Sequence, residues 1–226
     1  MRIKKILLII GFTIVLAIIF VTPAKAASSE IATLADSDSY VQSIFNTTNN
    51  GDSTSVFFGY NLNFNEFDEA YIHFNFSAKP ENWEKAEISI DATMFGQFNA
   101  TVCLITENWG EGTITWVNKP LHGEIITTFE VTGTAFYKFD ISNYIQGESI
   151  SVCINASNSY EQSGYVMATS REGHGAGLHI GPQLIWTYET DEPIIEGYNL
   201  YIFLGLIVVI GIIGIQKKKL KIKFKN

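Results

Sequence analysis

Three aspartates in the first third of this 226-residue chain have the type and spacing of metal ligands. Asp36 and Asp38 stand two positions apart in the stretch LADSDSY, and Asp52 follows in the polar stretch NTTNNGD. Calcium binds about six to eight oxygen atoms, which carboxylates and the backbone carbonyls of a loop can supply. The pattern therefore predicts a Ca²⁺ site at these three residues. The alternative is a solvated turn.

Arg171 is the one arginine beyond Arg2, and Glu172 and His174 follow it in the stretch TSREGHG. These three residues form a candidate ligand-binding group, since a lone guanidinium could clamp a sugar acid. The favoured alternative is an ion pair with a nearby carboxylate such as Glu172 or Glu111. The glycine-rich stretch that follows could form one lip of a groove. It lacks the Lys-Ser/Thr ending of a phosphate-binding loop.

Two tryptophans, Trp109 and Trp116, lie in the stretch ENWGEGTITWVNKP at positions 107–120. Such rings could stack on a sugar, belong to a catalytic cleft or pack at a corner of the fold. A tryptophan pair within one strand-turn-strand corner is more often packing than a ligand platform, and Asn118 and Pro120 are typical turn residues. We therefore expect a structural corner.

Catalytic motifs are missing from the sequence. It contains no Gly-x-Ser-x-Gly or His-Glu-x-x-His motif. Glycosidases need two carboxylates about 5–10 Å apart, and with 23 acidic residues some pair will meet that distance by accident. We therefore expect a protein without enzymatic activity.

The elements that must position these residues have the alternation of β-strands. Apolar side chains recur at every second position in several short stretches, which Gly, Asn and Asp separate. The alternating sets are Ile72, Phe74 and Phe76; Ile88, Ile90 and Ala92; Val102 and Leu104; Phe139 and Ile141; and Ile150, Val152 and Ile154. This pattern predicts an all-β domain, a jelly-roll β-sandwich.

The same alternation places the two cysteines, Cys103 and Cys153, on the outward faces of their strands. In an oxidising compartment we expect one disulfide bond between neighbouring strands. The alternative is two free thiols on strands that do not meet, because the strand order cannot be derived from the sequence. Two cysteines without further partners do not make a zinc site.

Four Asn-x-Ser/Thr sequons predict N-glycosylation. They lie at Asn46, Asn75, Asn99 and Asn155. Asn46 belongs to a polar loop, and the period-two alternation predicts that the side chains of the other three point outward from their strands. We therefore expect an exported and glycosylated domain.

The two ends of the chain have the features of membrane-directed segments. A basic start, the apolar run Ile6 to Val21 and the small residues of Ala24-Lys25-Ala26 predict a signal peptide at 1–26, the alternative being an uncleaved anchor. The uncharged run from Leu200 to Ile215, followed by six lysines, predicts a transmembrane helix at 199–216 and a basic cytoplasmic tail at 217–226. A buried core helix is the disfavoured alternative.

Between these segments lie a predicted β-sandwich ectodomain at 27–190 and a linker at 191–198. Residues 27–199 carry all 23 acidic side chains but five Lys or Arg, a formal charge of −18. Such a surface repels nucleic acid and anionic polymers.

Seven stretches, taken in order along the chain, resemble the DNRLRE domain, which is also classed as carbohydrate-binding module family 96. They lie at 34–42, 46–60, 70–77, 86–94, 107–120, 137–145 and 168–173. The most specific is the run Trp-x-Glu-x-x-x-Thr-Trp-x-Asn-x-Pro from Trp109 to Pro120, followed about fifty residues later by Ser-Arg-Glu. The resemblance covers about residues 34 to 188 and implies a jelly-roll sandwich that binds polysaccharide. The segment from Pro193 to Lys219 resembles the C-terminal sorting signals of archaeal surface proteins.

These observations predict a single-pass membrane protein of the cell surface, with its N-terminus outside and a module that binds carbohydrate or matrix. We expect a neutral polysaccharide or glycoprotein as partner rather than an anionic one. The competing hypothesis is a structural surface protein or adhesin that uses the sandwich as a spacer or protein-binding unit. An exposed aromatic strip on one sheet would favour the first hypothesis, and a large apolar patch the second.

Overall fold

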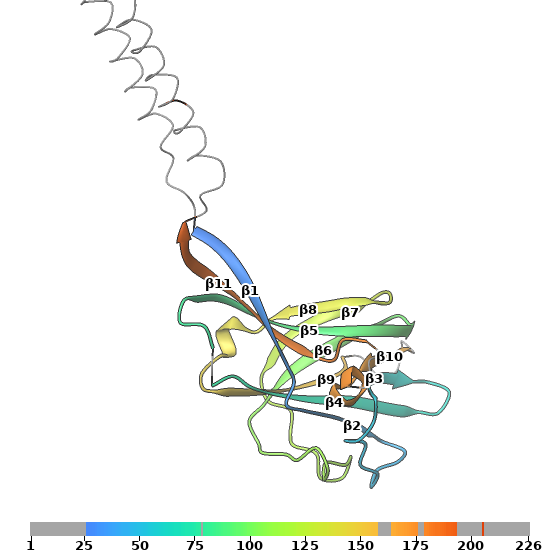
Figure 1. The fold of residues 1–226 in the computed structure, drawn as a ribbon. Coiled ribbons are helices and arrows are strands. Elements are labelled where there is room, and N and C mark those ends of the chain that lie inside the picture. Colours follow the sequence, from blue (N-terminus) through green and yellow to red (C-terminus); the bar gives the residue numbers. More distant parts are fainter. Residues whose placement is uncertain (1–25, 78, 158–163, 176–178, 194–204, 206–226) are drawn as a thin grey trace, which may run out of the picture. The chain divides into compact units, whose positions relative to one another are not determined.

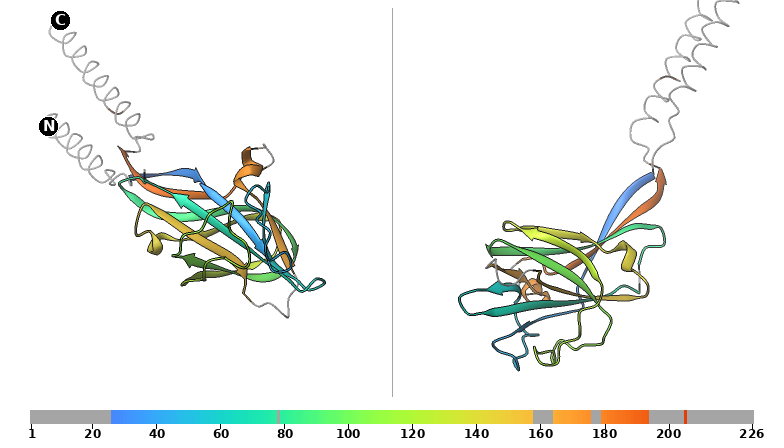
Figure 2. Two further views of the ribbon diagram at one scale, coloured as in Figure 1. Left: turned by 90° about the horizontal axis from the view of Figure 1, so that it is seen from below. Right: turned by 180° about the vertical axis from the view of Figure 1, so that it is seen from behind.

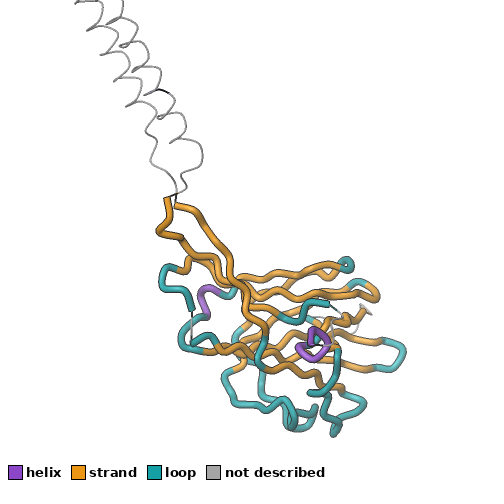
Figure 3. The backbone as a smooth tube through the Cα atoms, in the orientation of Figure 1, coloured by secondary structure: helices purple, strands orange, loops and turns teal. Residues whose placement is uncertain are grey.

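The computed structural model describes residues 26–77, 79–157, 164–175, 179–193 and 205. These residues form strands and loops almost throughout (Figure 3). The chain divides into one compact unit of Ser28–Glu189 and a second unit of Met1–Ala27 with Thr190–Asn226. The all-β prediction is confirmed.

The described residues form eleven strands of 6 to 14 residues. They are β1 (Ala26–Leu34), β2 (Ser37–Gln42), β3 (Ser55–Asn61), β4 (Glu66–Asn75), β5 (Trp83–Gly96), β6 (Phe98–Ile105), β7 (Ile125–Val131), β8 (Ala135–Asp140), β9 (Ser149–Ala156), β10 (Gly164–Thr169) and β11 (Gln183–Pro193). The described helices are the 3-10 turn η1 (Ser142–Tyr144) and the short α2 (Arg171–Gly175).

The strands form one hydrogen-bonded sheet that curls back on itself (Figure 1). Its order is β1-β11-β5-β10-β3-β4-β9-β6-β7, with β2 beside β4 and β8 beside β5. Rings from the two halves of this order meet across the core: Phe58 of β3 lies 6.2 Å from Phe98 of β6, and Phe129 of β7 lies 5.9 Å from Phe139 of β8. This arrangement is consistent with a β-sandwich. Figure 2 shows the curled sheet from two further sides.

The inward side chains are those that the alternation predicts. Ile72, Phe74, Ile88, Val152 and Ile154 are fully buried in one core cluster. Burying an aliphatic or aromatic side chain of this size stabilises a fold by about 1.5–3 kcal/mol. Because the strand period is two, each inward set fixes which residues lie on the opposite face.

The outward face of β4, β6 and β9 is covered, which the alternation does not predict. The segment 106–124 between β6 and β7 folds over it and forms a second cluster of buried residues, Val41, Tyr71, Ile105, Ile114 and Cys153. Trp109 and Trp116 of that segment pack against the cluster. Both cysteines point away from the main core, as the alternation predicts, but this face is not open to solvent, since Cys103 is 4% and Cys153 0% exposed.

The tryptophan stretch is a structural corner, as expected. Trp109 meets Tyr71 edge to face at 5.9 Å, and its indole Nε1 donates a hydrogen bond to Ser151 Oγ at 3.3 Å. The neighbouring loop is tied to it, because Asn49 Nδ2 donates to the carbonyls of Glu111 and Ile114. The turn prediction for Asn118 is also met, since its Oδ1 accepts from Thr115 N at 2.6 Å.

We expect Trp109→Ala to lower the free energy of unfolding by about 1–2 kcal/mol. The indole is half-buried, so its removal uncovers part of the second cluster without opening the main core. Urea unfolding of the variant beside wild type measures this. An unchanged urea midpoint would show that the ring does not support the fold.

The predicted membrane-directed segments lie almost entirely outside the described residues. The signal peptide is represented by Ala26, the transmembrane helix by Gly205 and the linker by 191–193. No helix in the described part of the chain has the length and hydropathy of a membrane span. The signal peptide, the span and the basic tail stay predictions.

Candidate functional site

Aromatic rings line the face of β3, β10 and β5 that points away from the core. Val56 and Phe58 of β3 and Val166 and Ala168 of β10 are buried in the core. The residues between and beside them therefore point to the opposite face. These residues include Phe57 and Tyr165, and Phe95 of β5 has the same orientation as Thr93.

The rings form a continuous row. Phe95 and Tyr165 are stacked with centroids 4.8 Å apart and an interplanar angle of 19°. Tyr165 lies 6.5 Å from Phe57, and Phe57 lies 4.9 Å from Tyr40. We call Phe95, Tyr165, Phe57 and Tyr40 the aromatic strip, in which Tyr40 of β2 also packs against the main core cluster. Phe95 is 45% exposed, and the other three rings are half-buried.

A glycine leaves the space that this row needs. Gly59 is the cross-strand neighbour of Tyr165 and has a φ of +139°, which side-chain-bearing residues rarely adopt. A Cβ at Gly59 would lie 2.4 Å from the carbonyl oxygen of Gly164 and 3.1 Å from Cβ of Tyr165. The strand pairing beside Tyr165 therefore requires glycine.

Polar groups lie farther along this face, beyond Thr93 on β5. Asp91 lies on β5 with the same outward orientation, and His179 Nδ1 is 3.3 Å from its Oδ2. His174 Nδ1 contacts the carbonyl of His179 at 3.2 Å. A row of aromatic rings on a face that also carries hydrogen-bonding groups suits a ligand with apolar C–H surfaces and hydroxyl groups, because aromatic rings combine a large apolar surface with specific geometry.

Arg171 forms ion pairs, the favoured alternative from its sequence. Its Nη2 lies 2.9 Å from Glu111 Oε2 and also contacts Glu172 Oε1. Its backbone N–H donates to Asp38 Oδ2 at 2.7 Å, and Asp38 N–H donates to Glu111 Oε1 at 2.9 Å. Three segments far apart in sequence are joined here. A role of Arg171, Glu172 and His174 in ligand binding stays a prediction.

The aspartates predicted to bind Ca²⁺ do not share one site. Asp38 lies with Glu111 and Glu172, whose carboxylate oxygens come within 4.8 Å of its own. Asp36 instead accepts a hydrogen bond from the backbone N–H of Asn75, and Asp52 is exposed. Asp38 Oδ1 and Glu172 Oε2 are buried without a hydrogen-bond partner among the described residues. A bound Ca²⁺ stays a prediction, with Asp38 as the ligand best placed for it.

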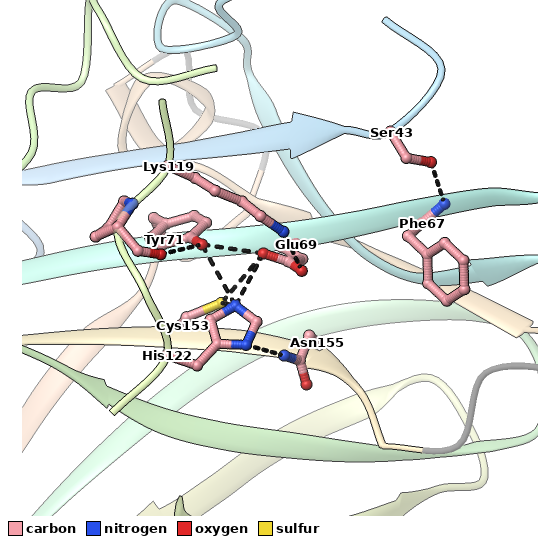
Figure 4. Close-up of polar contacts among 9 residues, drawn as sticks. Ser43, Phe67, Glu69, Tyr71, Lys119, His122, Cys153 and Asn155 are labelled. Atoms are coloured by element: carbon pink, nitrogen blue, oxygen red, sulfur yellow. Dashed lines mark hydrogen bonds and ion pairs between the residues drawn. The ribbon is translucent and has the colours of Figure 1, made fainter. Parts of the chain in front are cut away.

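A second polar cluster lies between segment 106–124 and the outward face of β4 and β9 (Figure 4). Glu69 accepts from Lys119 Nζ at 2.6 Å, and its other oxygen is 3.0 Å from both Tyr71 Oη and His122 Nε2. Cys153 Sγ is 3.6 Å from His122 Nε2. Sequence reasoning missed Glu69 and His122, because neither stands in a motif.

The cysteine and histidine of this cluster are placed like a catalytic nucleophile and its base, but their environment does not activate the thiol. His122 Nδ1 is 3.2 Å from Asn155 Nδ2, which completes a row of three groups. Complete burial, and after it the charge of Glu69, raise the pKa of Cys153 well above its ordinary value. A nucleophilic cysteine needs a lowered pKa and access to substrate.

Segment 106–124 also carries a small hollow of about 240 Å³. Its lining residues are Asn108, Trp109, Gly110, Thr113, Ile114 and Asn118. This volume lies below the roughly 300–1,000 Å³ of common small-molecule pockets. The open face of the aromatic strip is therefore the better candidate for a large ligand.

A sequence profile of carbohydrate-binding module family 96 matches residues 30–185. The chain belongs to this family. The match begins within β1 and ends within β11, so the aromatic strip and both polar clusters are parts of the family 96 module. Membership supports carbohydrate binding and is consistent with the expected lack of enzymatic activity.

No curated protein matches the chain. Among solved structures, an FMN-binding β-glucuronidase from Facaelibacterium prausnitzii L2-6 aligns at 13% identity over 72% of this chain and 23% of its own, with a TM-score of 0.33. The infectious bursal disease virus Gx strain aligns at 15% identity over 76% and 37%, with a TM-score of 0.18. Both TM-scores are too low to inform fold or function.

The two cysteines of the module are free thiols, so the structure does not support the predicted disulfide bond. The strands do meet, with Cys103 directly opposite Cys153 on β6 and β9. Directly opposed residues of antiparallel strands have Cβ atoms about 4.5–5.5 Å apart, whereas a disulfide needs about 3.5–4.5 Å. The thiol of Cys153 approaches Glu69 and His122 instead.

The sequons of the module differ in accessibility. Asn46 and Asn75 are exposed, as expected, but Asn99 and Asn155 are half-buried. The side chain of Asn155 is also engaged with His122. Glycosylation itself stays a prediction, with Asn46 and Asn75 the more accessible acceptors.

Proposed function

We propose that this family 96 module binds a neutral polysaccharide along the aromatic strip and has no catalytic role. The single observation that carries the proposal is the row of Phe95, Tyr165 and Phe57 across three neighbouring strands. A row of rings across neighbouring strands offers successive apolar contacts to an extended chain. Family membership supports carbohydrate as the ligand class.

The charge of the module supports a neutral ligand. A formal charge of −18 over residues 27–199 repels an anionic polymer at long range. The one arginine of the module is held by Glu111 and Glu172, so it is not free to pair with a sugar acid. Asp91 and His179, which contact one another farther along the same face, offer hydrogen-bonding groups to the hydroxyls of a neutral glycan.

We further propose that the module is displayed outside the cell. The predicted signal peptide, transmembrane helix and basic tail support this location, with residues 27–190 outside and 217–226 inside. Because the segment from Pro193 to Lys219 resembles an archaeal sorting signal, we also propose that the helix is removed and that a lipid takes its place. Intact mass of the mature protein distinguishes a retained tail from a processed one.

The test of carbohydrate binding is a pair of substitutions in the strip. Phe95→Ala and Tyr165→Ala should each weaken binding about tenfold to hundredfold, since stacking on an aromatic ring contributes about 1–3 kcal/mol per planar ligand unit. A glycan array with the purified chain first selects a ligand. Isothermal titration calorimetry with that ligand then compares the variants.

Phe45→Ala is the matched control, because Phe45 is 56% exposed but lies in the turn after β2 and is not part of the strip. Its affinity should equal that of wild type. Equal losses in all three variants would place the ligand elsewhere. If the wild type binds no neutral or acidic glycan on the array, the alternative is favoured, which is a spacer or protein-binding unit of a surface protein.

A further inference from the structure

We propose that Glu69, His122 and Cys153 form a binding site for a divalent transition metal such as Zn²⁺. This site is separate from the aromatic strip, since it lies on the outward face of β4 and β9 under segment 106–124. The three ligand atoms all lie within 4.8 Å of one another. Each comes from a different element: Glu69 from β4, Cys153 from β9 and His122 from the covering segment (Figure 4).

The distances between these atoms fit the edges of a tetrahedron. Zinc bonds of about 2.3 Å to sulfur and about 2.0 Å to nitrogen or oxygen give edges of about 3.3–3.6 Å. The observed separations are 3.6 Å from Cys153 Sγ to His122 Nε2, 3.9 Å from Cys153 Sγ to Glu69 Oε2, and 3.0 Å from Glu69 Oε2 to His122 Nε2. A metal ion therefore fits with side-chain shifts of a few tenths of an ångström.

Neighbouring groups orient the proposed ligands. Lys119 Nζ and Tyr71 Oη hold Glu69, each through a different carboxylate oxygen. Asn155 contacts His122 Nδ1, and its amide can present either nitrogen or oxygen to that atom. An oxygen that accepts from Nδ1–H leaves Nε2 free to bind a metal. Partners of this kind commonly support metal-binding histidines.

The donor set selects the class of metal. One thiolate, one imidazole and one carboxylate suit Zn²⁺ and similar ions, whereas Ca²⁺ and Mg²⁺ prefer oxygen ligands alone. Binding replaces the proton of the Cys153 thiol by the metal and releases that proton to solvent. The side chain of His122 is 32% exposed, so the ion has a path of entry, and water can complete the coordination.

The structure also explains why the sequence argues against zinc. Neither cysteine is separated from a histidine by the short intervals that are typical of zinc motifs. His122 precedes Cys153 by 31 residues in the sequence. The pairing of β4 with β9 brings Glu69 to the thiol, and the return of segment 106–124 over β9 brings His122 to it. Neither arrangement leaves a local signal in the sequence.

The experiment is a titration of the purified, reduced full-length chain with Co²⁺, followed by displacement with Zn²⁺. Cobalt bound to a thiolate in a four-coordinate site has a near-ultraviolet sulfur-to-metal band and visible bands. We expect both to saturate at about one equivalent and to vanish on addition of Zn²⁺. No sugar is required, so the result is independent of the proposed carbohydrate binding.

Substitutions identify the ligands. Cys153→Ser should remove the sulfur-to-metal band, and His122→Ala, in an exposed segment, should weaken Co²⁺ binding at least about tenfold. Cys103→Ser is the matched control and should bind as wild type. The proposal is overturned if the wild type shows no saturable band, if Cys103→Ser loses the band and Cys153→Ser keeps it, or if His122→Ala binds with unchanged affinity.

Discussion

Replacing Arg171 with alanine is expected to lower the free energy of unfolding by about 2–3 kcal/mol. The guanidinium lies between Glu111 and Glu172, and the buried Asp38 is within the same group. Its removal leaves three carboxylates in mutual repulsion without a cation, and breaking one side of a partly buried pair costs more than the pair contributes. The 40% exposure of the arginine side chain keeps the cost below that of a fully buried pair.

Urea unfolding measures this effect. Lys85→Ala is the matched control, because Lys85 also forms an ion pair with a glutamate, Glu87, at 2.7 Å, but is 44% exposed and makes this one ion pair among the described residues. An exposed pair contributes at most about 1 kcal/mol. Adding Asp38→Asn to Arg171→Ala should restore part of the loss. Similar urea midpoints for Arg171→Ala and Lys85→Ala would contradict the role assigned to Arg171.

Stability is expected to fall as pH rises from about 4 to about 7, through two buried carboxyl groups. Burial, followed by the charges of Glu172 and Glu111, raises the pKa of Asp38 from 3.8 to about 7. Burial and the charge of Glu66 raise the pKa of Asp68 to about 7 as well. Between these pH values the folded state holds protons that the unfolded chain has lost, so the free energy of unfolding decreases with pH.

Each carboxyl contributes up to about 4 kcal/mol to this change, fully present below about pH 4 and lost by about pH 7. Unfolding in urea at several pH values should show a smaller slope in Asp38→Asn and in Asp68→Asn. Asp140→Asn is a control in which the slope should change in the opposite direction. Hydrogen bonds from Ser142 outweigh desolvation and lower the pKa of Asp140. Slopes that are equal in wild type, Asp38→Asn and Asp68→Asn would refute the assignment.

Local patterns determined the class of fold and much of its interior. The period-two alternation of Ile72 with Phe74 and of Ile88 with Ile90 identifies both the strands and their inward faces, because a pleated strand turns successive side chains to opposite sides. The pair of tryptophans and the turn residue Asn118 indicated a packed corner for a similar local reason. The partners of Arg171 were foreseeable because an isolated cation among many carboxylates finds one of them.

Tertiary structure alone decided what the outward faces do. Alternation places Cys153 and Tyr165 outside equally, yet segment 106–124 buries the first, and the second remains half-buried in the aromatic strip. The stack of Phe95 on Tyr165 and the meeting of Glu69, His122 and Cys153 depend on strand order and register between distant segments. Strand pairing is set by the packing of the whole chain, and period-two alternation is the same whichever strands become neighbours.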